Sequence, residues 1–138
     1  MLVVMVLDGQ GGGLGRSIIE ALAKELPEAE TVAVGTNSAA TAAMVRASKI
    51  QGATGENAVA YNAARADYIV APLGAYFANG LMGEISAPMA AALCSSRAYK
   101  IAVPGISSPV AIASHHPLPA SEEVRQAVSL LKTRCGSK

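Results

Sequence analysis

Five glycines fall within seven consecutive positions near the start of this chain, in the stretch DGQGGGLGR at residues 8–16. The stretch follows the aliphatic run 2–7 and precedes a segment whose apolar residues recur at helical spacing. Glycine weakens a helix or strand that it interrupts, so such a cluster is typical of a turn with positive φ or of a close approach of another group to the backbone. The order of strand, glycine turn and helix predicts a parallel sheet with crossover helices.

Strand-like and helix-like segments alternate through the rest of the chain. Short aliphatic or β-branched runs predict strands, and amphipathic or alanine-rich stretches predict helices. The predicted strands are 2–7, 31–34, 68–71 and 99–103, with 109–113 as a short edge strand, and the predicted helices are 14–26, 38–46, 86–96, 120–134 and one that ends at about Arg65 after a turn at 52–55. This alternation predicts a Rossmann-like, doubly wound parallel sheet of four or five strands in a three-layer α/β/α arrangement.

Length and composition limit the classes of protein that the chain can represent. Its 138 residues are close to the commonest domain size, so we expect a single nucleotide-binding domain over residues 1–138. Charged residues make up 15%, well below the roughly 25% of average soluble domains, which predicts a homo-oligomer, a dimer or a tetramer, that covers part of the surface. The net charge of +1 without a basic run argues against nucleic acid. The chain has no long apolar run, and MLVVMVLDG lacks the basic residues of a signal peptide. We therefore expect no association with a membrane and a cytoplasmic location.

Three of the predicted strands end in turns suited to ligand binding: DGQGGGLG, GTNS and APLG. In a doubly wound sheet such turns lie along one edge and face one crevice. We expect Gly9 to form the tight turn, the glycines at 11–13 to let N–H groups approach a pyrophosphate at the helix N-terminus, and Gly15 to let the helix pack close to the strand. The predicted cofactor-binding residues are Gly9, Gln10, Gly11, Gly12, Gly13, Leu14, Gly15, Thr36, Asn37, Ser38, Thr54, Pro72, Leu73 and Gly74.

The spacing of the glycines points to a particular kind of turn. The common dinucleotide fingerprint G-x-G-x-x-G fails, because Leu14 stands where its third glycine belongs. The spacing Gly9-x-x-x-Gly13-x-Gly15 resembles the cofactor turn of short-chain dehydrogenases, a family of NAD(P)-dependent Rossmann enzymes. NAD-binding domains usually carry an acidic residue about 20 positions after the glycines, whereas this region reads GTNS at 35–38, which favours NADP over NAD as the cofactor. A glycine turn that serves packing alone is the alternative.

The resemblance to dehydrogenases does not extend to their catalytic residues. The Tyr-x-x-x-Lys pair is missing; the nearest approach is Tyr61 followed by Arg65, and arginine does not shuttle protons. Taken whole, residues 3–103 resemble a group of short bacterial Rossmann-like proteins of unknown function, through DGQGGGLG, GTNS, GATGEN and GEI. That resemblance implies the fold and a cofactor-type site but no reaction.

Other polar residues are weaker candidates. Glu56 in GATGEN suits either a general acid or base, or a first-turn carboxylate favoured by the helix dipole. Asn79 and Glu84 in ANGLMGEIS are candidates for substrate contact, with a helix end between the glycines as the plain alternative.

The sequence is compatible with three functions. The first is a dinucleotide-binding domain that transfers hydride with NADP if it is an enzyme, and the second is a non-catalytic nucleotide sensor or accessory subunit. A third, metal handling by His115, His116 and Cys94, is less favoured, because adjacent histidines point apart on a helix or strand.

Overall fold

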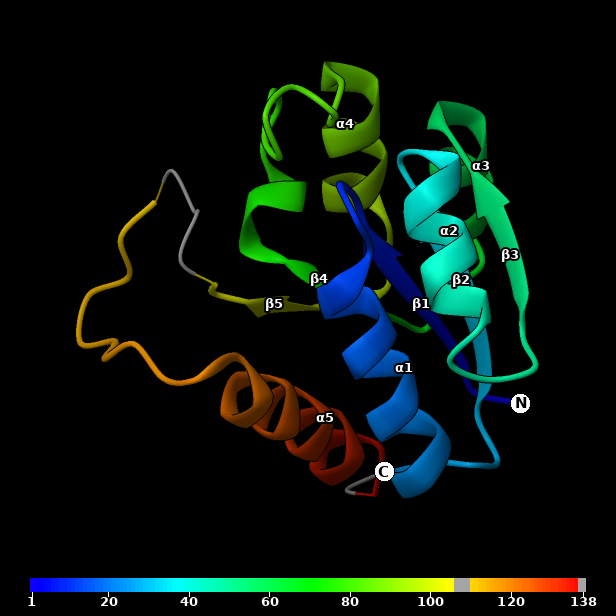
Figure 1. The fold of residues 1–138 in the computed structure, drawn as a ribbon, viewed down its shortest axis with the longest axis vertical. Helices are drawn as coiled ribbons and strands as arrows, with labels where there is room; N and C mark the ends of the chain where they lie inside the picture. Colours follow the sequence, from blue (N-terminus) through cyan, green and yellow to red (C-terminus); the bar gives the residue numbers. More distant parts are fainter. Residues whose placement is uncertain (106–109, 137–138) are drawn as a thin grey trace.

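Five parallel strands form one central sheet in the computed structural model, which describes residues 1–105 and 110–136 (Figure 1). The strands are β1 (Val3–Asp8), β2 (Glu30–Gly35), β3 (Gln51–Thr54), β4 (Tyr68–Pro72) and β5 (Tyr99–Val103), in the order β3-β2-β1-β4-β5. The helices are α1 (Gly13–Glu25), α2 (Ser38–Val45), α3 (Glu56–Ala63), α4 (Ala87–Ser95) and α5 (Ala120–Gly136), with a short 3-10 helix η1 (Leu73–Tyr76) after β4. The Rossmann-like fold is therefore confirmed, with five strands.

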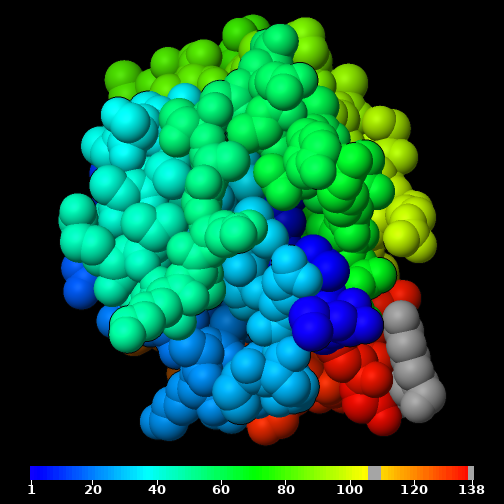
Figure 2. Space-filling view, turned by 90° about the vertical axis from the view of Figure 1, so that its right-hand side faces the viewer, coloured from blue at the N-terminus to red at the C-terminus, as the bar shows by residue number. Residues whose placement is uncertain are grey.

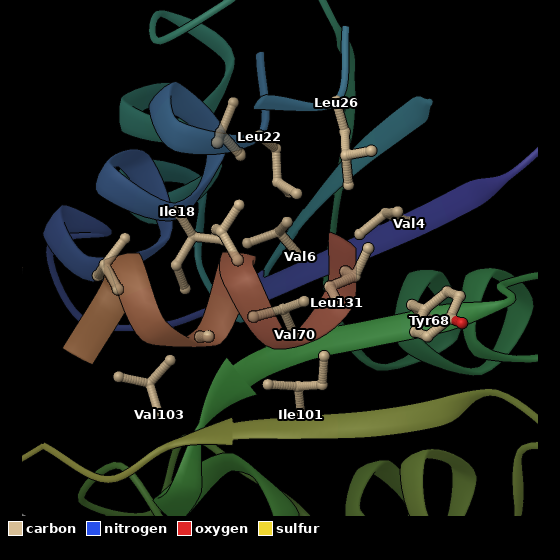
Figure 3. Packing of buried hydrophobic residues seen from close by; sticks show 14 of the residues in the cluster. Val4, Val6, Ile18, Leu22, Leu26, Tyr68, Val70, Ile101, Val103 and Leu131 are labelled. Atoms are coloured by element: carbon tan, nitrogen blue, oxygen red, sulfur yellow. The ribbon is translucent and has the colours of Figure 1, made fainter. Parts of the chain in front are cut away.

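Helices cover both faces of the sheet because its strands are apolar on both sides. In β1, Val4 and Val6 face the layer of α1 and α5, where they pack with residues such as Ile18, Leu22 and Leu131 (Figure 3). Met5 and Leu7, which alternate with them, face the layer of α3 and α4. This period-two alternation of buried residues gives the three layers.

The order of the strands fixes where a ligand can bind. From β1 the chain proceeds outward to β2 and β3 and then returns to place β4 on the other side of β1. The reversal leaves a crevice outside the carboxyl ends of β1 and β4, which is where doubly wound sheets bind ligands. The glycine turn lies at that end, whereas the N-terminus and the last turn of α5 lie at the opposite end (Figure 1). Figure 2 shows the N-terminal residues next to the last helix at that far end.

Two local predictions are wrong. The segment 52–55 was expected to be a turn, but its first part belongs to the edge strand β3, which pairs with β2. Gly52 fits there because a Cβ at this position would lie 2.5 Å from Cγ1 of Val45 and 2.9 Å from Cγ2 of Thr41, so α2 crosses the strand closely. The short edge strand expected at 109–113 is not formed by residues 110–113, and position 109 lies outside the described residues. Among the described helices, none has the length and apolar character needed to cross a membrane.

Candidate functional site

The glycine turn connects β1 to α1 and is shaped by three glycines that the fold itself requires. Gly12 is the N-cap of α1 with φ of 74°, and a Cβ there would lie 2.7 Å from the carbonyl oxygen of Ala40. A Cβ at Gly9 would lie 2.7 Å from Thr36 Oγ1. At Gly15 it would lie 2.8 Å from Cβ of Asp8. Side chains at these positions would collide with β1, with the end of β2 or with α2.

Asp8, the last residue of β1, fastens the turn to the helix. Its buried carboxylate accepts the backbone N–H of Gly9 at 2.8 Å and that of Gly15 at 2.7 Å. Gly15 lies in the first turn of α1, so Asp8 supplies the capping acceptor that Gly12 lacks. Burial raises the pKa of Asp8 above its ordinary value, against the lowering effect of the two N–H groups.

The other two glycines of the turn leave open space. A Cβ at Gly11 or Gly13 would meet no atom within 4 Å, and neither residue has a positive φ. The hydrogen bonds found among residues 1–105 and 110–136 do not use the backbone N–H of Gly11, Gly13 or Leu14. Two of these groups are at the start of α1, where the helix dipole adds positive potential. The turn therefore carries three N–H donors without a partner among the described residues.

The residues that carry these donors line a cleft at the switch point of the sheet. The cleft has a volume of about 200 Å3. Its lining comes from the carboxyl ends of three strands and the residues next to them, namely residues 8–14 at β1, Pro72 and Gly74 at β4, and Pro104 and Gly105 at β5, together with Leu81. Of the predicted residues, the turn at 9–14 thus comes together with Pro72 and Gly74.

A carboxylate occupies the carboxyl end of β2, on the other side of β1 from the cleft. Glu84 Oε1 accepts three hydrogen bonds, from the backbone N–H of Gln10 at 2.9 Å, from Thr36 Oγ1 at 2.5 Å and from Asn37 Nδ2 at 2.9 Å. These bonds, that of Thr36 first, lower the pKa of Glu84 below its ordinary value, so the group is ionised at neutral pH. Asn37 also caps α2, because its Oδ1 accepts the N–H of Ala40 at 2.8 Å. The predicted residues Thr36 and Asn37 therefore hold a side chain of the protein itself.

Besides Gly15, Thr36 and Asn37, four more predicted residues do not line the cleft. Ser38 is an exposed first residue of α2, and Leu73 begins η1. Thr54 pairs with Thr41 through their hydroxyls at 2.7 Å. Glu56 Oε2 accepts Ser86 Oγ at 2.5 Å, which connects α3 to the cap of α4. Thr54 and Glu56 thus hold neighbouring elements together.

The histidines and the cysteine weighed for metal binding do not form one cluster. His115 Nε2 lies 3.5 Å from Oε2 of the buried Glu123, whose Oε1 accepts the N–H of Gly105 at 3.0 Å. Cys94 lies on α4, where its Sγ is 3.6 Å from the carbonyl oxygen of Tyr76. In the part of the chain that the structure describes, no group of three or more metal-ligating side chains comes together.

The sheet order and the glycine turn define a Rossmann-like α/β protein with a small cleft at the switch point. The family model for a domain of unknown function (DUF3842) matches residues 3–136, so the chain belongs to this family. No curated protein matches. A crystal structure of a dodecameric, FMN-dependent UbiX-like decarboxylase from Escherichia coli O157:H7 is similar, with a TM-score of 0.52 and 16% identity over 96% of this chain and 94% of that one. At this identity the likeness concerns the fold.

The comparison corrects the predicted cofactor. NADP or NAD was expected, whereas the similar structure is that of an FMN-dependent protein. The site contains a physical reason against NADP, because the ionised carboxylate of Glu84 lies on Thr36 and Asn37, where a 2′-phosphate was expected. The prediction rested on the absence of a carboxylate near β2 in the sequence, and the loop after β4 supplies one. The likeness of the glycine turn to that of short-chain dehydrogenases stays a prediction.

Proposed function

We propose that this protein binds a phosphorylated flavin of the FMN type, with its phosphate on the backbone N–H groups of Gly11, Gly13 and Leu14. The observation that carries the proposal is that these three N–H groups, at and just before the start of α1, have no partner within the described residues, in a turn where a Cβ at Gly11 or Gly13 would meet no atom within 4 Å. Helix N-termini with free N–H groups bind phosphate through hydrogen bonds and the helix dipole. Glycine at 11 and 13 is not needed by the internal packing, which supports a role in the approach of a ligand.

The size of the cleft is consistent with a site for the phosphate end of a ligand. Pockets for small molecules usually have volumes of about 300–1,000 Å3, so a cleft of about 200 Å3 suits the phosphate end of a ligand. Pro72, Leu81 and Pro104 give it apolar walls next to the phosphate-binding turn. A bound flavin supplies the redox chemistry, and the residues of this chain supply its binding and orientation. Both a flavin-dependent enzyme and a flavin-binding accessory subunit would use such a site.

Titration with FMN and riboflavin, followed by flavin fluorescence and calorimetry, tests the proposal. We expect wild-type protein to bind FMN more tightly than riboflavin, which lacks the phosphate. Gly11→Ala and Gly13→Val should each weaken FMN binding by at least about tenfold, or about 1.4 kcal/mol, with little effect on riboflavin. Gly136→Ala is the matched control, because a Cβ there also meets no atom within 4 Å and the residue lies at the end of α5. Equal affinity for the two flavins, or normal FMN binding by both turn variants, would reject the proposal.

We also infer that copies of this chain associate, and the observation that favours this is the set of exposed apolar side chains. Met82 is 92% exposed and Leu130 63% exposed, in a chain with few charges. The similar FMN-dependent protein is dodecameric. Light scattering after size-exclusion chromatography measures the mass directly, and a monomer at micromolar concentration would contradict the inference.

A further inference from the structure

We infer that Glu84 is a specificity-determining residue, which restricts the site to mononucleotides by keeping the second half of a dinucleotide off the carboxyl end of β2. The inference rests on the proposed function. In doubly wound sheets a dinucleotide lies across the switch point, with one nucleotide half on each side of the first strand. The cleft of this protein lies on the side of β4 and β5. The other side, next to β2, is where Glu84 lies.

Glu84 uses the donors that a second nucleotide half would need. The Thr36 hydroxyl and one N–H of the Asn37 side chain both point to Glu84 Oε1, as does the backbone N–H of Gln10. Asn37 Nδ2 also donates to the carbonyl oxygen of Gln10 at 3.0 Å, and its Oδ1 is used by the cap of α2. The polar groups at the end of β2 are therefore satisfied within the protein, and a ligand would have to displace the carboxylate to reach them.

The backbone holds the carboxylate in this position. The loop that carries Glu84 has positive φ at Asn79, Leu81, Met82 and Gly83. Such conformations cost on the order of 1–3 kcal/mol each for residues other than glycine and persist only where the surroundings fix them. The bond from the N–H of Asn79 to the carbonyl oxygen of Ile85, at 2.7 Å, closes the loop at its base. The loop conformation thus fixes the position of Glu84 at the end of β2.

The charge of Glu84 adds to the steric exclusion. The three donors around it are neutral, so the carboxylate keeps its full negative charge at the end of β2. The carboxyl group of Asp8 lies behind the same turn, and Glu84 raises its pKa further through their like charges. A diphosphate or a 2′-phosphate brought to this side meets repulsion at short range. A single phosphate on Gly11, Gly13 and Leu14 would lie at the cleft instead, because these residues line it.

The first test compares FMN with FAD, which share the flavin and differ by an adenylate. We expect wild-type protein to favour FMN by at least about 100-fold, which is about 2.7 kcal/mol. Glu84→Ala should reduce this preference at least tenfold by tightening FAD binding, with FMN affinity changed less than threefold. Glu84→Gln removes the charge but keeps the size, so it should lie between the two. Glu56→Gln, which removes another carboxylate bonded to a hydroxyl, is the control and should behave as wild type.

A second test needs no flavin. Titration with adenosine 2′,5′-bisphosphate, followed by NMR at the side-chain amide of Asn37, should shift that signal in Glu84→Ala and leave it unchanged in wild-type protein. If wild-type protein does not bind FMN, the proposed function is rejected. The bisphosphate titration alone then tests whether Glu84 blocks the end of β2. Three results would overturn the inference about Glu84. They are an unchanged preference of Glu84→Ala for FMN over FAD, a loss of FAD binding in that variant, and bisphosphate binding by neither protein.

Discussion

Gly80 packs directly on Gly74: a Cβ atom at position 80 would lie 1.8 Å from the carbonyl oxygen of Gly74. This contact joins the loop that carries Glu84 to η1, and η1 contributes Gly74 to the wall of the cleft. The obstacle is backbone, which cannot move aside as a flexible side chain would. The position therefore admits glycine alone.

We expect Gly80→Ala to lower the free energy of unfolding by about 2 kcal/mol, within the 1–3 kcal/mol range typical of overpacking. Urea denaturation followed by circular dichroism measures the change. Gly11→Ala is the matched control, because a Cβ there meets no atom within 4 Å, and it should unfold as wild type does. A Gly80→Ala variant within about 0.5 kcal/mol of wild type, the usual range for neutral surface changes, would contradict this interpretation.

Asn37 has two separable roles, as the cap of α2 and as a donor to Glu84. Asn37→Ala removes both and should cost about 1–2 kcal/mol of stability. Asn37→Asp keeps a capping oxygen for Ala40 but brings a second carboxylate against Glu84, so we expect a loss of stability at neutral pH through like-charge repulsion. Chemical denaturation at pH 7 gives both values.

The double variant Asn37→Asp with Glu84→Gln separates these contributions. Once the Glu84 charge is gone, the carboxylate introduced at position 37 should act as an ordinary cap, and the double variant should be more stable than Asn37→Asp alone. The non-additive part of this cycle reports the interaction between the two side chains. Additivity of the two changes would show that they do not interact in solution.

Tyr76 joins the two strands that border the cleft. Its hydroxyl lies 3.0 Å from the carbonyl oxygen of Ile101 in β5 and 3.3 Å from that of Ile69 in β4. Burial raises the pKa of Tyr76, so the hydroxyl stays protonated and donates across the pH range of most experiments. Tyr76→Phe should cost about 0.5–1.5 kcal/mol of unfolding free energy, the usual net value of a hydrogen bond. Stability equal to wild type in urea denaturation would show that the hydroxyl contributes nothing.

Most of the fold could be predicted from sequence because its signals are local. The runs that form β1 and β4 are apolar on both faces, and the glycine cluster marks the crossover into α1. The sequence did not indicate β3, because this strand, Gln51–Thr54, is short, consists mainly of exposed residues and includes Gly52. Its strand conformation comes from pairing with β2, which no local pattern indicates.

Only the part of the candidate site that is formed by one short stretch of sequence could be predicted. The turn at 9–14 was identified from its glycines, whereas the bond between Gln10 and Glu84 joins residues 74 positions apart. It also depends on positive φ at Leu81 and Met82, which the usual preferences of these residues disfavour. The spacing of Asn and Gly in ANGLMGE was the available signal for a left-handed loop that ends in a carboxylate.

The hydrogen bonds to Glu84 make a prediction about pH. The pKa of Glu84 is lowered in the folded protein from an ordinary value of 4.5, so its ionised form stabilises the folded state above that pH. This contribution is lost as the pH falls from about 4.5 through the lower pKa of the folded state. We therefore expect the difference in unfolding free energy between wild type and Glu84→Gln to be largest at about pH 6–7 and to shrink below about pH 4.5.

Urea denaturation of both proteins at a series of pH values between about 7 and 3 measures this difference. Asp8 acts in the opposite direction, because its raised pKa favours the folded state in acid, but it is present in both proteins and largely cancels in the comparison. Thr36→Val removes the donor that lowers the Glu84 pKa most, so wild type and this variant should also converge as the pH falls. The difference in unfolding free energy between wild type and Glu84→Gln could instead stay constant or grow down to about pH 3. This result would mean that the Thr36, Asn37 and Gln10 donors do not hold the ionised carboxylate in solution.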